Sequence, residues 1–237
     1  MRFARFAAPF LLMAACISGA AALAADRRET RSTEPFTAIG VSAPITVHLT
    51  QGDAYSLVVE GDEAALAELE TVVENNSLKL RQKTNAHVRG MGKVKAYVTA
   101  RDLTALAISG SGDILATTLR TGDVKLAISG SGDIKIATLT ANKVVVAISG
   151  SGDVLVAGKG DSLDASIAGS GDLRARELEV GDAKVSIAGS GDASISTRSN
   201  LSVSIVGSGD VSYVGDPAVR QSILGSGSVR RVGAKSS

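Results

Sequence analysis

Six aspartates recur at one position of a short glycine-rich motif, and their carboxylates are the groups in this chain best suited to chemistry. The tetrapeptide Gly-Ser-Gly-Asp returns every 18 to 20 residues and ends in Asp113, Asp133, Asp153, Asp172, Asp192 and Asp210. A seventh copy, at Gly225, reads Gly-Ser-Gly-Ser. Carboxylates at a constant interval could bind Ca²⁺ between successive repeats. They could instead cap turns by accepting hydrogen bonds from Ser or Gly N–H groups.

We favour turn capping over a metal site for this aspartate ladder. Calcium-binding β-rolls use a nine-residue repeat, which brings their aspartates closer together along the chain. Here one aspartate falls in each repeat of about 19 residues. Two carboxylates at strand spacing repel by about 1 kcal/mol in water, so hydrogen bonds must compensate the row.

The segments that flank each motif read as β-strands. Before the turn, apolar residues alternate with small or polar ones, as in the run from Val124 to Ser129. After the turn comes a further apolar pair, such as Ile134 with Ile136, and then a polar turn. Apolar residues at every second position predict strands with one buried face. Each repeat is therefore expected to contain a strand, a Gly-Ser-Gly-Asp turn, a second strand and a polar turn.

A unit of this size cannot bury its apolar face alone, and stacking identical units solves the problem. We therefore predict an all-β fold, a right-handed β-helix (β-solenoid) of about 19 residues per coil, since parallel β connections are overwhelmingly right-handed. The buried column is expected to contain Ile128, Ile148, Ile167, Ile187 and Ile205. The alternative is an antiparallel meander with a hairpin at every motif.

The chain divides by composition into five segments. We predict a signal peptide over residues 1–24, a polar linker over 25–33, an N-terminal cap region over 34–100, solenoid repeats over 101–232 and a tail over 233–237. The cap region lacks the motif, and its stretch from Asp62 to Val73 has the acidic start and the Ala/Leu content of a short helix.

The first residues resemble a secretory signal, with two Arg, an apolar run and a small-residue exit at Ala22-Leu23-Ala24. We expect cleavage after Ala24 and export. Two alternatives stay open. The small residues before Cys16 resemble a bacterial lipobox, so Cys16 could be lipidated, and the apolar run could remain as an uncleaved membrane anchor.

Composition narrows the classes of function. The formal net charge is +1, which gives no basis for nucleic-acid binding or a polybasic membrane contact. One Cys and two His leave little material for a disulfide framework, a zinc site or a catalytic triad. We expect no cofactor, no metal and no catalytic residues.

The stretch FTAIGVSAPITVHLTQGDAYSLVVEGDEAALAELETVVENNSLKLR, followed by the Gly-Ser-Gly-Asp ladder, resembles the bacterial head GIN domain family. The likeness covers about Phe36 to Val229. Members of that family are labelled putative auto-transporter adhesins. The resemblance implies an exported β-helical protein of the periplasm, cell envelope or outer surface, often a lipoprotein, and supplies no catalytic residues.

One outward surface could bind a partner. Small or apolar residues flank the isoleucine that precedes each motif, and we call this surface the Ala/Ser face: Ala107, Ala127, Ala147, Ser166, Ser186, Ser204 and Ser222 with Ser109, Ser129, Ser149, Ala168, Ala188, Val206 and Leu224. It could receive a glycan, an envelope protein or a second copy of the chain. We expect a non-catalytic structural or adhesive module. The alternative is a polysaccharide lyase or hydrolase, because such enzymes use β-helices.

Overall fold

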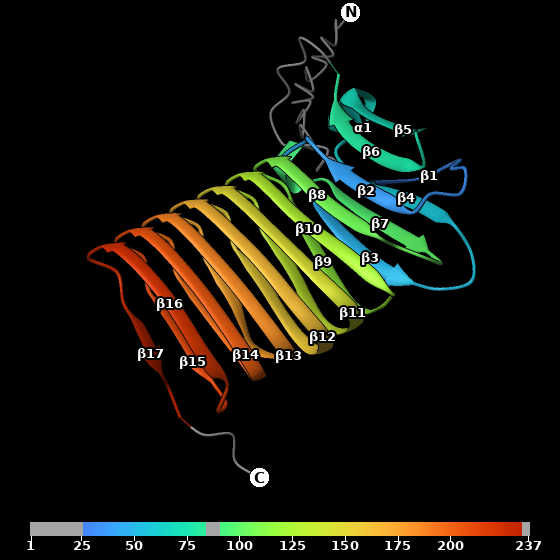
Figure 1. Cartoon of the computed structure of the whole chain (residues 1–237). Helices are drawn as coiled ribbons and strands as arrows, with labels where there is room; N and C mark the ends of the chain where they lie inside the picture. The colour runs from blue at the N-terminus through green and yellow to red at the C-terminus, as the bar shows by residue number, and fades with distance from the viewer. Residues whose placement is uncertain (1–25, 84–90, 234–237) are drawn as a thin grey trace, which may run out of the picture.

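The computed structural model describes residues 26–83 and 91–233, and its dominant feature is a long stack of parallel strands (Figure 1). About six turns of chain form a β-solenoid, so the all-β solenoid predicted from the repeat is confirmed. The short helix α1 (Glu63–Glu68) lies at one end of the stack. The strands β16 (Ala218–Gly225) and β17 (Val229–Arg231) lie at the other end.

The repeats supply the middle of the stack. Its strands are β8 (Ala105–Gly110), β9 (Asp113–Arg120), β10 (Asp123–Gly130), β11 (Ile134–Gly150), β12 (Val154–Gly169), β13 (Leu173–Gly189), β14 (Ala193–Gly207) and β15 (Val211–Val214). Strands β11 to β14 continue through the polar turn, so each one contributes to both sheets of its coil. Neighbouring coils pair in parallel, with motif glycine opposite motif glycine. Parallel pairing excludes the antiparallel meander.

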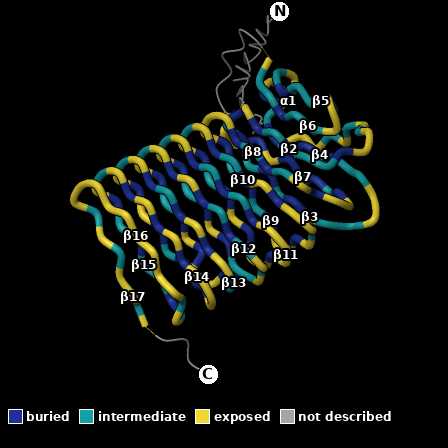
Figure 2. The backbone as a smooth tube through the Cα atoms, in the orientation of Figure 1, coloured by how far each residue is buried: buried dark blue, intermediate teal, exposed yellow. Residues whose placement is uncertain are grey.

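The core is a column of aliphatic side chains that runs between the two sheets, and Figure 2 marks the buried positions that recur along the coils. The five isoleucines predicted to stack are aligned in register, and each is at most 2% exposed. Full burial of one such side chain stabilises the fold by about 1.5–3 kcal/mol. The buried and exposed positions alternate along each strand because successive side chains point to opposite faces.

Two glycines per motif are required by the corner. Gly150 has a φ of +125°, a conformation that side-chain-bearing residues rarely adopt. Gly152 is required for a different reason, since a Cβ on it would lie 2.1 Å from the carbonyl oxygen of Gly132 in the preceding coil. The corners of successive coils therefore approach too closely for any side chain.

The region before the repeats extends the stack and then closes it. Its strands are β1 (Arg27–Arg31), β2 (Ala38–Val41), β3 (Thr46–Gln51), β4 (Ser56–Gly61), β5 (Leu69–Glu74), β6 (Ser77–Gln82) and β7 (Lys95–Ala100), with a 3₁₀ turn η1 (Met91–Lys93). Strands β2 and β3 lie between β6 and β7 on one side and β8 and β9 on the other, all in parallel. Beyond them, β5, β4 and β1 add antiparallel strands. Parallel stacking therefore begins inside the region expected to be a cap.

Two local expectations were wrong. The helix expected from Asp62 to Val73 ends at Glu68, and β5 follows it directly. The second half of that stretch carries the β-branched run Thr71, Val72 and Val73, and it pairs with β6. The segment expected to be a linker contains β1, which pairs with β4. The Arg31 guanidinium in β1 donates to the carbonyl oxygens of Leu66 and Leu69, which ties this strand to the end of α1.

Candidate functional site

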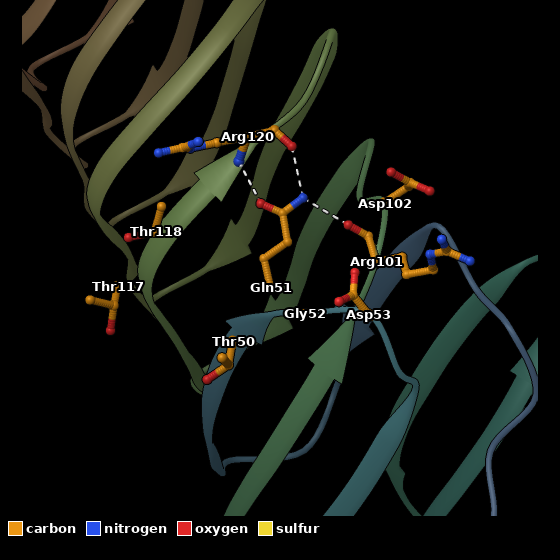
Figure 3. A pocket seen from close by; sticks show the side chains of 9 residues that line it. All are labelled: Thr50, Gln51, Gly52, Asp53, Arg101, Asp102, Thr117, Thr118 and Arg120. Atoms are coloured by element: carbon orange, nitrogen blue, oxygen red, sulfur yellow. Dashed lines mark hydrogen bonds between the residues drawn. The ribbon is translucent and has the colours of Figure 1, made fainter.

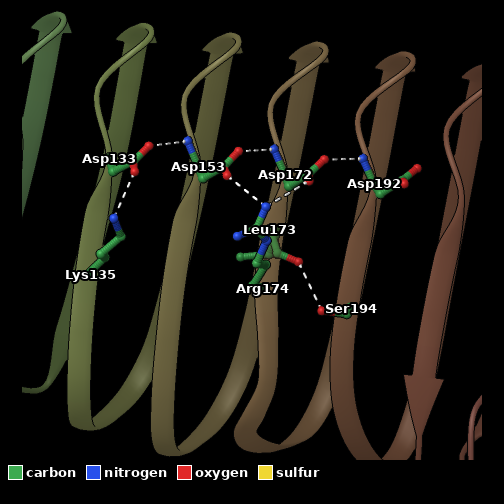
Figure 4. A network of polar contacts seen from close by, with 8 residues as sticks. All are labelled: Asp133, Lys135, Asp153, Asp172, Leu173, Arg174, Asp192 and Ser194. Atoms are coloured by element: carbon green, nitrogen blue, oxygen red, sulfur yellow. Dashed lines mark hydrogen bonds and ion pairs between the residues drawn. The ribbon is translucent and has the colours of Figure 1, made fainter.

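The structure brings the six motif aspartates into one row along an edge of the solenoid, and Figure 4 shows four of them, Asp133, Asp153, Asp172 and Asp192. Asp113 is the first residue of β9, and each of the other five aspartates immediately precedes the strand after its corner, so the in-register stacking of the coils sets one above the next. The Oδ1 atom of each accepts a hydrogen bond from the backbone N–H of its counterpart one coil further along the chain. These N–O distances lie between 2.7 and 3.1 Å, and the last aspartate, Asp210, serves the N–H of Ser228.

The donors differ from those expected. The N–H groups of the motif Ser and second Gly donate instead to a glycine carbonyl of the preceding coil, as Ser151 and Gly152 do to Gly130 at 2.9 and 3.1 Å. Those donors are therefore engaged in the corner-to-corner contact. The aspartate carboxylate instead accepts from the N–H of the motif aspartate in the next coil. It therefore connects two coils and does not close its own turn.

Basic side chains neutralise the middle of the row. The Lys135 ammonium lies 2.9 Å from Oδ2 of Asp133, and Arg174 lies 3.0 Å from Oδ2 of Asp153 and 3.4 Å from that of Asp172. The hydrogen bond with Asp133 raises the pKa of Lys135 above its ordinary value. Protein groups thus engage both oxygens of these three carboxylates. Across residues 26–83 and 91–233, no cluster of three or more His, Cys, Asp or Glu is arranged to hold a metal ion.

The Ala/Ser face is hollowed into a groove of about 460 Å³. Strands β2, β8, β10, β11 and β12 supply its lining, which includes Ser109, Ser129, Ser149 and Ala168 from the predicted set. Small side chains line it because larger ones would fill the space between neighbouring strands. The side chains of the Ala/Ser face are larger at its C-terminal end. In its last two coils Val206 and Leu224 are 53% and 72% exposed.

A second hollow was not predicted from the sequence. A cleft of about 830 Å³ lies where the N-terminal strands meet the repeats, and its lining is polar: Thr50, Gln51, Gly52, Asp53, Arg101, Asp102, Thr117, Thr118 and Arg120 (Figure 3). The Gln51 side chain braces it by donating to the carbonyls of Arg101 and Arg120 and accepting from the Arg120 N–H. These residues come from three separate segments, 50–53, 101–102 and 117–120, so no local spacing in the sequence marks them.

Two sequence expectations fall on residues that the structure does not describe. The signal peptide, over residues 1–24, and Cys16 both lie before the described part of the chain, which begins at Asp26. Among the described residues no helix has the length and apolar character needed to cross a membrane.

Several solved structures have the same fold as this chain. A putative adhesin from Bacteroides fragilis NCTC 9343 is 23% identical, with a TM-score of 0.83 over 87% of this chain and 97% of that chain. A putative lipid binding protein from Parabacteroides distasonis ATCC 8503 is 24% identical, with a TM-score of 0.71 over 88% and 97%. A putative adhesin from Parabacteroides merdae ATCC 43184 is 21% identical, with a TM-score of 0.70 over the same shares. At these identities the likeness establishes the fold.

The comparison with curated proteins gives no match. The comparison with protein families gives one that spans most of the chain. Residues 35–217 match the family described as "Putative auto-transporter adhesin, head GIN domain". That match covers all of the described strands except β1, β16 and β17, and it covers six of the seven motifs. The chain belongs to the head GIN domain family of putative auto-transporter adhesins.

Proposed function

We propose that this chain is exported and acts as a non-catalytic adhesive module of the bacterial cell envelope, with the Ala/Ser face as its binding surface. The observation that supports this most is the groove of about 460 Å³ in that face. The groove crosses five parallel strands, and the opposite side of these strands packs against the hydrophobic core. Its floor of methyl and hydroxyl groups suits a flat partner that meets many shallow contacts at once.

A glycan is the partner class that we propose for this groove. The exposed Ser129 and Ser149 hydroxyls donate and accept hydrogen bonds in a row at strand spacing, and the methyl groups between them offer apolar contact. Lys125 at the rim adds a positive charge that favours an acidic sugar. An envelope protein or a lipid surface is the competing partner. The name of the Parabacteroides distasonis relative includes lipid binding.

A glycan array compares the chain with the double variant Ser129→Glu with Ala168→Glu, which places two acidic side chains on exposed positions of the face. The matched control is Thr138→Glu with Ser199→Glu, which adds the same charge at exposed positions away from the groove. We expect binding to one class of glycan, lost in the face variant and kept in the control. Glycan binding that survives the face variant would overturn the assignment of the site to the Ala/Ser face, and binding seen only with lipid vesicles would overturn the glycan assignment.

A panel of lyase and hydrolase assays on the same glycans tests the enzyme alternative. Turnover of any of them would contradict a non-catalytic role. Export is tested separately, by the intact mass of protein isolated from the native envelope. We expect a chain that begins at Ala25, and a lipidated chain that begins at Cys16 is the competing result. A mass that retains residues 1–15 would contradict both forms of processing.

A further inference from the structure

The two ends of the solenoid are finished differently. At the N-terminal end the outermost strands are β1 and β5, which carry Arg27, Arg28, Glu29, Glu70 and Glu74. Glu70 forms an ion pair with Arg81 at 2.8 Å, and Glu74 forms one with Lys79 at 2.6 Å. Charged edge strands discourage pairing with another chain. At the C-terminal end the outermost strands are β16, which reads AVRQSILG and carries one charge, and β17 in the other sheet, which reads VRR and pairs with β15.

The C-terminal end exposes the apolar core. Val219 and Ile223 lie opposite Leu201 and Ile205 of the preceding coil. Those two are 1% exposed, whereas Val219 and Ile223 are 38% and 37% exposed. Val206 and Leu224 continue the patch on the outer face. Among the described residues these four account for all the large exposed hydrophobic side chains except Leu155. Figure 2 shows β16 exposed along its length.

The free edge of β16 also carries unpaired backbone groups. The Lys125 N–H donates to the Thr104 carbonyl oxygen in the preceding coil. In the coils that follow, the residues at the same register position are Val145, Asp164, Lys184, Ser202 and Arg220. Arg220 therefore turns its N–H and C=O toward β14. Because these groups alternate in direction along a strand, those of Val219, Gln221 and Ile223 point to the open edge.

We propose that this edge is the interface of a homodimer, in which β16 of two copies pair antiparallel around a twofold axis through Gln221. The axis must pass through a residue rather than between two, because only then do core-facing side chains meet core-facing side chains. With Gln221 on the axis, Val219 of each copy opposes Ile223 of the other, and the two Gln221 amides face each other. All the outward N–H and C=O groups of these three residues then find partners.

A second copy of this chain fits the edge better than other occupants because the edge is self-complementary. The pairing continues the coil-on-coil contact that already joins β14 to β16, and twofold closure stops it at two copies. A strand of eight residues is about 26 Å long, and the two sheets make the end about 20 Å wide. The dimer then buries about 1,000 Å² in total, at the lower bound for specific interfaces, so we expect reversible association.

Sedimentation of the purified chain over a wide concentration range tests the dimer. We expect Gln221→Lys and Gln221→Glu each to weaken dimerisation by at least about tenfold, because each variant places two like charges on the axis. An equimolar mixture of the two variants should restore a dimer, since Lys then faces Glu. Gln221 is already exposed, so both variants are expected to fold, and circular dichroism checks that they do.

The matched control is Ala188→Lys, an exposed position two coils away on the outer face. It should dimerise like the unmodified chain. A chain that stays monomeric at every concentration overturns the proposal, as does a mixture of variants that fails to associate. Dimers that Ala188→Lys disrupts and Gln221→Lys does not would place the contact on the Ala/Ser face instead, and would also overturn it.

Discussion

The carboxylate of Asp133 accepts a hydrogen bond, at 3.1 Å, from the backbone N–H of Asp153, the equivalent residue of the next coil. The same contact recurs along the row, so each aspartate stabilises the coil that follows it. The side chain thereby supplies an acceptor at a corner where the regular ladder of backbone carbonyls is interrupted. This role requires an oxygen acceptor and does not require a negative charge.

Substitutions at Asp153 separate those two requirements. Asp153→Asn should cost less than about 0.5 kcal/mol, because the amide oxygen still accepts from the Asp172 N–H and because the lost ion pair is with Arg174, whose side chain is 57% exposed. Asp153→Ala should cost about 0.5–2 kcal/mol, as the loss of a helix cap does. Urea denaturation at neutral pH measures both.

Thermal unfolding with and without EDTA tests the calcium alternative for the same row. We expect no change in Tm. A gain of several degrees with added Ca²⁺, abolished by Asp133→Asn combined with Asp153→Asn, would show that the carboxylates bind the ion and would contradict the capping role.

The second glycine of a motif should tolerate no side chain. In Gly152→Ala the new methyl group would lie 2.1 Å from the Gly132 carbonyl oxygen, so adjacent corners must separate. Overpacking of this kind costs about 1–3 kcal/mol. Gly122→Ala is the control, because a Cβ there meets nothing closer than the Asn142 amide at 3.8 Å, and it should change stability by less than about 0.5 kcal/mol. Equal losses for the two variants in chemical denaturation would contradict this account.

Ile148 lies in the middle of the core column, between Ile128 and Ile167, and is 2% exposed. Ile148→Ala should cost about 2–5 kcal/mol, because it removes buried methyl groups and leaves a cavity. Ile148→Asp should prevent folding, because it buries a charge without a partner. Circular dichroism and the melting temperature follow both. A folded Ile148→Asp variant with an unchanged Tm would contradict the assignment of this column to the core.

Asp210 should make stability depend on pH at the C-terminal end. Hydrogen bonds from the Ser228 hydroxyl and then from its backbone N–H hold the pKa of this carboxyl below its ordinary value. Because the folded pKa is the lower one, the stabilisation is complete above the ordinary pKa of about 3.9 and is lost as the pH falls through the folded value.

Ser228→Ala removes the larger of these two contributions. This variant should lower Tm at pH 7. It should have no effect on Tm well below pH 3, where Asp210 is protonated in both the folded and the unfolded state. Asp216, whose carboxylate lies 3.0 Å from Arg231 and is 90% exposed, offers a control in Asp216→Asn, which should leave this pH dependence in place. A Tm difference for Ser228→Ala that is the same at both pH values would contradict the coupling.

Periodicity made the solenoid predictable. The alternation around Ile128, Ile148 and Ile167 repeats at one phase in every coil, so the buried face and the strand pairing follow from the sequence. The end of α1 was not predictable in this way. Ala and Leu run on to Leu69, but pairing with β6 outweighs local propensity there, and that pairing is a non-local contact.

The details of the surface were harder to predict than the core. The aspartate row was visible, but its donors depend on which N–H groups the corner already uses, and only the packed corners fix that. The cleft around Gln51 joins Arg101 and Arg120, which come from different coils and share no motif. The order of the first strands was also hidden, because β2 inserts between β6 and β8, and β3 between β7 and β9, against their order in the chain.

Because successive coils pair in the same register, the length of the solenoid is set by the number of its repeats. Removing residues 131–150 and joining Gly130 to Ser151 rebuilds an intact Gly-Ser-Gly-Asp corner. Every strand then meets a neighbour with the same pattern of core and surface positions, and the protein shortens by one strand spacing, about 4.8 Å. The distance between the charged N-terminal end and the apolar C-terminal end can therefore change in fixed steps, through gain or loss of whole repeats, without redesign of either end.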